Sequence, residues 1–398
     1  MKALFLSLPL HGHTNPALPL VRELTRGGDD VVCYSNPLFA QKIAQAGAIY
    51  RPYRHAGLAD MKRLPDRMEE LTVLLMRATA ETLRTQLEEW RALRPDYLIA
   101  DSVAPWGHWA GKLLGAPVVT SVPTLAINRR VMSYGLSRGM RPKSAASFLA
   151  KLSNFVKASG IRRQIVREFK VDGPGVIASI AGCSGLNIVY TSRYFQPCEE
   201  SFNSTFHFIG PSVADRGEIV EFPWDRLGAG RVVYISMGTL FNENVNFYRT
   251  CFEAFRGEDC RVILSTGANV ALTDLGAPPE NFIVRQYVPQ LEVLARASAF
   301  VSHGGMNSVN ESLMHSIPLL VIPQMGEQHI NGKRVEELKA GLLVSNAEAG
   351  SARLRHSVRR LLHEPQFREG AAAVRQSYTE AGGVARAAES IRAFIRRA

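Results

Sequence analysis

A histidine and an aspartate each follow an apolar run with the length of a buried strand. His13 comes after the run Ala3–Leu8, and Asp101 comes directly after Tyr97–Ala100. Ligands of open parallel sheets bind at the carboxyl ends of the strands, where an imidazole can act as a general base and a carboxylate can hold its tautomer. The pattern predicts a His13–Asp101 pair. A helix cap or a packed core position is the alternative for each residue.

The segment around His13 also has the signs of a helix start. Pro16 suits a first helical turn, and Thr14 or Asn15 is a suitable N-cap. Nothing further points to a chemical role for His11. The chain has no Gly-x-Ser-x-Gly motif and no convincing serine or cysteine nucleophile, which argues against a hydrolase.

The second candidate site is a glycine turn. The apolar run Phe300–Ser302 is followed by His303-Gly304-Gly305-Met306-Asn307-Ser308 and then by a helical pattern. Such a turn exposes backbone amides at a helix N-terminus, which attract anions, and His303 and Ser308 add donors. The spacing and the lysine of a Walker loop are missing. The turn predicts a phosphate or diphosphate site, and a purely structural tight turn is the alternative.

Polar residues on both sides of this turn suit a nucleotide sugar. Glu311 lies about one helical turn after Ser308, where its carboxylate can accept hydrogen bonds from ribose hydroxyls. Tyr287 can stack on a base, and Glu327 with Gln328 can bind sugar hydroxyls. Their structural alternatives are a solvated helix glutamate, a buried tyrosine and the first turn of a helix.

Short apolar runs alternate with longer amphipathic patterns along the whole chain, which predicts parallel sheets with helices on both faces. We expect two Rossmann-like domains whose sheets face across a cleft, because 398 residues exceed one core. The Pro- and Gly-containing stretch near 210–230 predicts an N-terminal domain 1–212, a linker 213–230 and a C-terminal domain 231–382. The predicted strands are Ala3–Leu8, Val31–Tyr34, Tyr97–Ala100, Val118–Val122, Leu186–Tyr190, Val232–Ser236, Val262–Leu264, Phe300–Ser302 and Leu319–Ile322.

The net charge of +11 is distributed unevenly. Segment 129–170 holds eleven basic residues and one acid, Glu168. Solvated helix faces are the simpler interpretation; weak attraction to a membrane surface or to an acidic acceptor is the other. Basic residues are not interleaved with aromatics, so we expect no nucleic-acid partner.

Five scattered cysteines without a Cys-x-x-Cys pair indicate neither a zinc site nor a disulfide framework, which favours a reducing, cytoplasmic location. The first apolar run is short, and we interpret it as a strand rather than a signal peptide. No run reaches the roughly 18 apolar residues of a membrane span. We expect a monomer or a homodimer.

Together these motifs resemble the family 1 glycosyltransferases, the UDP-sugar-dependent enzymes of the two-Rossmann GT-B fold, and most closely their bacterial macrolide and flavonoid branch. The resemblance covers nearly the whole chain. The most specific part is the donor cassette, whose members follow in family order. The motifs are Gly12-His13-Thr14-Asn15-Pro16, Asp101 with Trp106-Gly107, Ser236-Met237-Gly238-Thr239, Val288-Pro289-Gln290, His303 to Ser308, Glu311, Pro318, Pro323, Glu327-Gln328 and Asn331.

The resemblance implies a role for each matching position. His13 is the base that deprotonates the acceptor hydroxyl, and Asp101 orients it. The last helix, 383–398, returns to the N-terminal domain. The implied donor contacts are Tyr287 and Val288 at the base, Gln290 and Glu311 at the ribose, Thr239, His303, Asn307 and Ser308 at the diphosphate, and Glu327 and Gln328 at the sugar. Further implied donor-binding positions are Ser236, Gly238 and Gly305.

Three positions depart from the family pattern. Tyr287 stands where relatives have tryptophan, Glu327 stands where many have aspartate, and Gly28-Asp29-Asp30 replaces a common Gly-His-acid stretch. The implied reaction is a single inverting displacement, in which the UDP-sugar is a co-substrate. No carboxylate cluster suited to Mg²⁺ is apparent, so we expect no metal cofactor.

A hydrophobic, hydroxyl-bearing acceptor such as a macrolide, a flavonoid or another phenol is expected in the N-terminal domain. Core packing is the alternative for its candidate wall residues. Other hypotheses are a lipid-like or acidic acceptor with a TDP-sugar or another NDP-sugar, a same-fold UDP-sugar epimerase, and a non-catalytic nucleotide-sugar binder. The wall candidates are Met61, Met76, Trp106, Met132, Met140 and Phe148.

Overall fold

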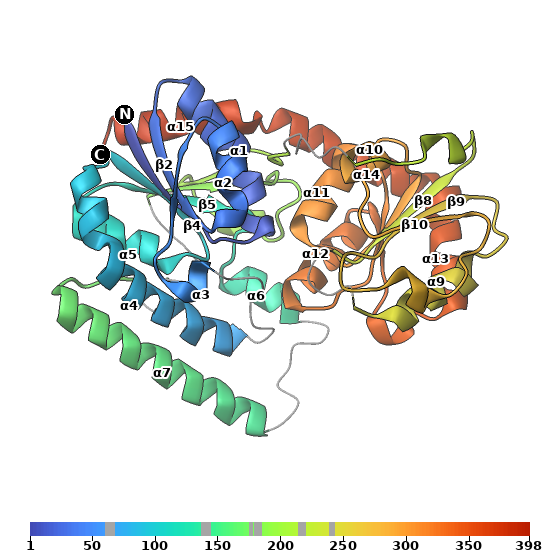
Figure 1. Ribbon diagram of the computed structural model, residues 1–398, viewed down its shortest axis with the longest axis horizontal. Helices are drawn as coiled ribbons and strands as arrows, with labels where there is room; N and C mark the ends of the chain where they lie inside the picture. The colour runs from blue at the N-terminus through green and yellow to red at the C-terminus, as the bar shows by residue number, and fades with distance from the viewer. Residues whose placement is uncertain (60–67, 137–144, 175–177, 179–184, 214–219, 239–242) are drawn as a thin grey trace. The chain divides into compact units, whose positions relative to one another are not determined.

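The chain forms two compact units, Met1–Ala214 with Ala381–Ala398, and Asp215–Glu380. The computed structural model describes residues 1–59, 68–136, 145–174, 178, 185–213, 220–238 and 243–398. Each unit is built on a sheet of parallel strands covered by helices (Figure 1). The predicted α/β class with two Rossmann-like domains is therefore confirmed.

The first sheet has seven strands, with β1 and β4 near its centre. Its inner strands are apolar and almost fully buried, as expected when helices cover both faces. In spatial order the strands are β3 (Ile49–Pro52), β2 (Asp30–Ser35), β1 (Lys2–Leu6), β4 (Tyr97–Asp101), β5 (Val118–Val122), β6 (Leu186–Val189) and β7 (Phe206–Phe208).

Two apolar clusters, one on each face of this sheet, hold the first unit together. Helices α1 (His11–Arg26), α2 (Ala40–Gln45) and α15 (Gly383–Ile395) cover one face (Figure 1). Ala387, Ala388 and Ile391 of α15 belong to that core, so the last helix is part of the first unit. The helices on the other face are α4 (Met68–Leu93), α5 (Pro105–Leu114) and α7 (Ala145–Phe169), and this unit also contains α3 (Ala56–Ala59) and α6 (Arg129–Leu136).

The second sheet has six parallel strands and one large apolar cluster against helices α9 (Val245–Phe255) and α13 (Ser351–His363). In spatial order its strands are β10 (Phe282–Arg285), β9 (Arg261–Ser265), β8 (Val232–Ser236), β11 (Ala299–Ser302), β12 (Leu319–Val321) and β13 (Gly341–Leu343). The remaining helices of this unit are α10 (Gln290–Leu294), α11 (Met306–Met314), α12 (Gly326–Glu337) and α14 (Pro365–Glu380).

Each sheet reverses its strand order at one place. In the first sheet the chain moves outward from β1 through β2 to β3 and then continues on the other side at β4. In the second sheet the same reversal lies between β8 and β11. Open α/β sheets bind ligands at such switch points, beside the carboxyl ends of the two strands. The fold therefore marks one candidate location in each unit.

All nine predicted strands are present, with ends that differ by at most two residues. Four further strands, β3, β7, β10 and β13, were not predicted from the sequence. Within the described part of the chain, no helix is both long and apolar enough to cross a membrane.

Candidate active site

His13 and Asp101 meet at the switch point of the first sheet. Asp101 is the last residue of β4, and His13 lies in the first turn of α1, which follows the neighbouring strand β1. His13 Nδ1 lies 2.9 Å from Asp101 Oδ2 and 3.1 Å from Oδ1. The backbone N–H of Val103 also donates to Oδ1, at 2.8 Å. The structure thus brings the two predicted residues into direct contact.

This contact determines which nitrogen of His13 is available. An ionised carboxylate only accepts hydrogen bonds, so the proton of a neutral His13 imidazole must sit on Nδ1. Nε2 then carries the lone pair, which is the state a general base needs. Asp101 is 1% exposed, whereas His13 keeps 9% of its surface open. The carboxylate is therefore shielded from water while the imidazole retains a solvent-facing edge.

The start of α1 differs from its prediction. The helix begins at His11 with Leu10 as N-cap and no side-chain cap, so Thr14 and Asn15 do not cap it. Pro16 lies inside the helix, one turn later than predicted. Since α1 starts earlier, His13 lies on a helix instead of in a loop.

Buried polar groups support this first turn. Thr14 Oγ1 lies 3.1 Å from Ser7 Oγ, which ties α1 to the loop after β1. The Tyr53 hydroxyl donates to the Ser7 carbonyl at 2.8 Å and accepts from Trp106 Nε1 at 3.1 Å. These bonds connect the segments that follow β1, β3 and β4. They hold the backbone on both sides of the His13–Asp101 pair.

His108, a second histidine near Asp101, was not predicted from the sequence. His108 lies on the buried side of α5 and is 8% exposed. Burial lowers its pKa to about 4, against an opposing influence of the Asp101 carboxylate. Its Nε2 is buried without a hydrogen-bond partner. His108 is therefore neutral at pH 7 and does not compete with His13 as a cation beside Asp101.

The second switch point carries the predicted glycine turn. Gly304 has φ of +83°, a conformation that favours glycine, and a Cβ there would lie 2.5 Å from Val321 Cγ1. The side chain of Asn331 on α12 donates to the Gly304 carbonyl at 2.8 Å, and Ser302 Oγ accepts the Gly304 N–H at 3.2 Å. Gly305 is the N-cap of α11 and has no side chain to cap it. The first-turn amides of α11 accordingly form an anion-attracting end.

His303 packs tightly between two glycines. A Cβ on Gly305 would lie 2.5 Å from His303 Nε2, and one on Gly238 would lie 2.6 Å from Cε1. Gly238 follows β8, and His303 follows the adjacent strand β11, so the packing joins the two sides of the switch point. Burial lowers the pKa of His303 to about 4, and its Nδ1 is a buried polar atom without a partner. This neutral imidazole can supply an N–H donor to an anion.

Gln290 and Glu311 are also brought together. Gln290 Nε2 donates to Glu311 Oε2 at 2.6 Å, and its Oε1 accepts from the Tyr234 hydroxyl at 3.0 Å. Glu311 is only 3% exposed, so this carboxylate is held in a nearly dry position. Tyr234, a buried residue of β8, was missed, because its place in an apolar strand gives no sign of a polar role.

The other donor candidates have varied environments. Tyr287 is 57% exposed, which leaves its ring open for stacking, while Val288 is buried. Gln328 Oε1 accepts the backbone N–H groups of Gln324 and Met325, so its carbonyl end fastens the start of α12. Thr239 lies outside the described residues. The half-buried candidates at these strand and helix ends are Gly238, Gly305, Asn307, Ser308 and Glu327, and Ser236 is buried.

The acceptor-wall prediction needs correction at two positions. Met76 and Trp106 have no exposed surface and belong to the apolar core between the first sheet and its helices. Their size and apolar character serve packing, so neither side chain presents a surface to an acceptor. Met132 on α6 is 47% exposed. Met61, Met140 and the side chain of Phe148 lie outside the described residues.

Metal ligands are a separate question. Among the residues that the structure describes, no group of three or more histidine, cysteine, aspartate or glutamate side chains could hold a metal ion. The four cysteines of that part, Cys33, Cys198, Cys251 and Cys260, form no disulfide.

Several known proteins resemble this chain in sequence and in fold. The family profile "Erythromycin biosynthesis protein CIII-like, C-terminal domain" matches residues 252–386. The NDP-glycosyltransferase YjiC of Bacillus subtilis (strain 168) is 32% identical over 396 residues, which cover 98% of this chain and 97% of that protein. The demethyllactenocin mycarosyltransferase of Streptomyces fradiae is 31% identical, covering 98% of this chain and 86% of its own length. The crystal structure of CalG4, the calicheamicin glycosyltransferase, matches with a TM-score of 0.80 and 27% identity over 100% of this chain and 98% of that one.

Proposed function

The chain belongs to the macrolide branch of the family 1 glycosyltransferases, and on this premise we propose that it transfers a hexose from a UDP-sugar to a hydroxyl of a hydrophobic small molecule. Glucose is the first candidate for the sugar. The contact between His13 and Asp101 is the observation that carries the proposal, because it leaves a basic nitrogen at the switch point of the first sheet.

In the proposed reaction, His13 Nε2 removes the proton of the acceptor hydroxyl. The oxygen attacks the anomeric carbon as the bond to the diphosphate breaks on the opposite face, so the configuration inverts. The proton remains on His13, and the Asp101 carboxylate stabilises the resulting imidazolium across 2.9 Å. Asp101 is thus a positioning residue that acts through His13.

The second switch point suits the leaving nucleotide. Negative charge develops on the diphosphate as the sugar departs, and the N-terminus of α11 with the neutral imidazole of His303 can stabilise it. Glu311, held by Gln290, is the candidate acceptor for ribose hydroxyl hydrogen bonds. Asn307 and Ser308 are further candidates at the diphosphate, and we propose that catalysis needs no metal ion.

The identities of the donor and the acceptor are inferred from the relatives. YjiC is described as an NDP-glycosyltransferase, so a TDP-sugar remains the alternative donor. The Streptomyces fradiae relative is named a demethyllactenocin mycarosyltransferase, and the matching family profile is named for erythromycin biosynthesis. On that basis a macrolide is our first acceptor, followed by flavonoids and other phenols.

The deciding experiment incubates the purified chain with UDP- and TDP-sugars and a panel of aglycones, with mass-spectrometric detection of glycosides. His13→Ala should lower transfer at least about 100-fold, the usual scale of a lost general base, while UDP binding by calorimetry is unchanged. His11→Ala, at an exposed position two residues away on the same helix, is the matched control and should keep its activity.

Three outcomes would contradict the proposal. Near-native transfer by His13→Ala would eliminate the base. UDP binding without product for any acceptor would indicate a binding module. Conversion of the UDP-sugar to its epimer in the absence of acceptor would indicate an epimerase. Inversion is checked separately by NMR of the product's anomeric proton, and metal independence by activity in EDTA.

A further inference from the structure

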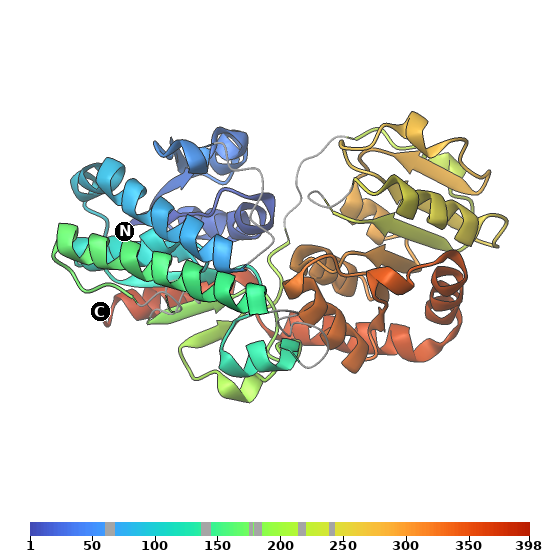
Figure 2. The ribbon, with the colours of Figure 1, turned by 90° about the horizontal axis from the view of Figure 1, so that it is seen from below.

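Helix α7 has one face that is exposed to solvent and packs on no other element within the described residues. Its opposite face packs on α4 (Figure 2). Ala158 and Ile165 of α7 are fully buried in the apolar core that α4 also joins. Residues four and three apart share a side of a helix, so five of the exposed residues of α7 form one stripe. All five members of this stripe are exposed: Leu152, Val156, Gly160, Arg163 and Arg167.

The first part of the stripe is apolar, and the exposed Phe155 lies beside it on α7. Leu152, Phe155 and Val156 are 51%, 49% and 57% exposed. Single exposed apolar side chains are ordinary, but three large ones within five residues form a patch of the kind that marks an interaction site. Phe155 precedes Val156 and lies one turn from Leu152, so the three side chains are neighbours on α7.

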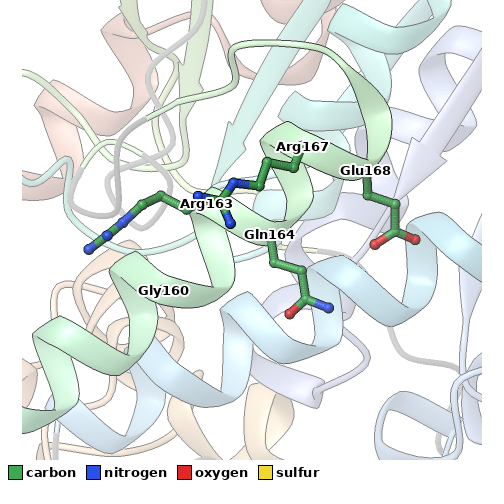
Figure 3. A pocket seen from close by; sticks show the side chains of 5 residues that line it. All are labelled: Gly160, Arg163, Gln164, Arg167 and Glu168. Carbon is green, nitrogen blue, oxygen red and sulfur yellow. The ribbon is translucent and has the colours of Figure 1, made fainter.

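The second part of the stripe is cationic. Gly160, Arg163, Gln164, Arg167 and Glu168 line a shallow, open groove on α7, and the absence of a side chain at Gly160 contributes to it (Figure 3). Arg163 and Arg167 extend on one side of the helix in this view, and Glu168 lies on the other.

The acidic residues nearby do not neutralise these arginines. Glu168 forms two short hydrogen bonds with Arg84 of α4, at 2.7 and 2.6 Å. Asp172 pairs with Arg162 instead. Within the described part of the chain, neither Arg163 nor Arg167 has an ion-pair partner. The stripe therefore joins an exposed apolar end to an uncompensated positive end.

We propose that this face of α7 docks the chain on bilayers that contain anionic phospholipids. Leu152, Phe155 and Val156 enter the boundary between headgroups and acyl chains, while Arg163 and Arg167 contact lipid phosphates. A soluble anion would use the arginines but not the apolar end, and an uncharged apolar partner would use only the apolar end. A bilayer with negative headgroups satisfies both parts. The surface is independent of the proposed transfer reaction.

The test is co-sedimentation of the full chain with vesicles of phosphatidylcholine alone or with added phosphatidylglycerol. The chain should bind the anionic vesicles and not the neutral ones, and binding should weaken as salt rises. Arg163→Gln with Arg167→Gln should lower the partition coefficient about 30-fold at low salt. Phe155→Ser with Val156→Ser should lower it at least about tenfold.

The matched control removes two positive charges elsewhere. Arg368 and Arg375 are exposed on α14 of the second unit, and Arg368→Gln with Arg375→Gln should change the partition coefficient less than threefold, about 0.6 kcal/mol. Circular dichroism melts confirm that every variant is folded. Equal binding to neutral vesicles, or equal losses from the α7 and α14 charge pairs, would overturn the proposal. So would a dimer by light scattering that dissociates in the Phe155/Val156 variant, because a second copy would then be the occupant.

Discussion

Replacing Asp101 with asparagine should reverse the tautomer of His13 with almost no change in shape. Oδ1 of Asp101 accepts the Val103 N–H at 2.8 Å, while Oδ2 is the nearer oxygen to His13 Nδ1, at 2.9 Å. An asparagine keeps the Val103 bond if its oxygen stands at Oδ1. Its NH₂ group then faces Nδ1 and donates to it, so the proton of the imidazole moves to Nε2. The proposed base loses its lone pair.

The expected magnitude follows from the loss of the carboxylate charge beside the imidazolium. Two unit charges about 4 Å apart at an effective dielectric constant of about 20 interact by about 4 kcal/mol, which corresponds to roughly 1,000-fold in rate. The unfavourable tautomer adds to this loss, and the analogous change in a serine protease lowers kcat about 10⁴-fold. We expect kcat to fall between about 10³- and 10⁴-fold. The free energy of unfolding should change little, because the side-chain volume and the Val103 bond are kept.

The assay is steady-state transfer to a phenolic or macrolide acceptor, with UDP affinity measured by calorimetry. The single variants Asp101→Asn and His13→Ala are compared with the double variant. Since Asp101 acts only through His13, the double variant should be no slower than His13→Ala alone. The reasoning is refuted if the rate losses of the two single variants multiply in the double variant. It is also refuted if Asp101→Asn transfers within threefold of the wild-type rate, or if its defect is confined to UDP binding.

Three further predictions concern Glu311, Gly305 and His108. Glu311→Gln should weaken UDP binding about tenfold to 100-fold, because the charge-assisted bond to Gln290 at 2.6 Å and the carboxylate are lost; calorimetry checks it, and unchanged affinity would contradict a ribose role. Gly305→Ala should lower UDP affinity by displacing the His303 ring, since the new Cβ would lie 2.5 Å from Nε2; unchanged affinity would show that the ring position is unimportant. Burial lowers the pKa of His108 from 6.5 to about 4, so between these pH values His108 is protonated in the unfolded chain but neutral in the folded one. The free energy of unfolding should therefore fall by up to about 3 kcal/mol as the pH drops from 6.5 to 4. His108→Leu should show a smaller fall in urea melts over this range, and an unchanged slope would contradict the assignment.

The interior strands of both sheets could be predicted from the sequence, while all four edge strands could not. The four missed strands, β3, β7, β10 and β13, are the outermost strands of the two sheets. An interior strand is covered on both faces and reads as a continuous apolar run. An edge strand has neighbours on one side only: β3 has no fully buried residue, and β13 has one, Gly341. Their identity depends on pairing with the strand that precedes each of them in the sequence, which local composition does not reveal.

The limits of the site prediction have a similar origin. Strand ends locate His13, Asp101 and His303, because the carboxyl edge of a parallel sheet follows from strand direction. Burial depends on contacts between segments far apart in the chain. Trp106 was therefore placed on an acceptor wall although it lies in the core, and His108 was overlooked although it lies near Asp101.

The comparison of His13 with His303 shows what such distant contacts decide. Each histidine lies next to a glycine in the sequence and follows a strand at a switch point, β1 for His13 and β11 for His303. The two local sequences therefore look alike. His13 meets a carboxylate from the adjacent strand, which sets its tautomer and favours its protonated form during a reaction. His303 packs against Gly238 and Gly305, and burial keeps it neutral. A histidine with a carboxylate partner suits proton removal, and a histidine without one suits hydrogen-bond donation to an anion. The partner that the fold supplies, more than the local motif, therefore distinguishes a general base from a hydrogen-bond donor to phosphate.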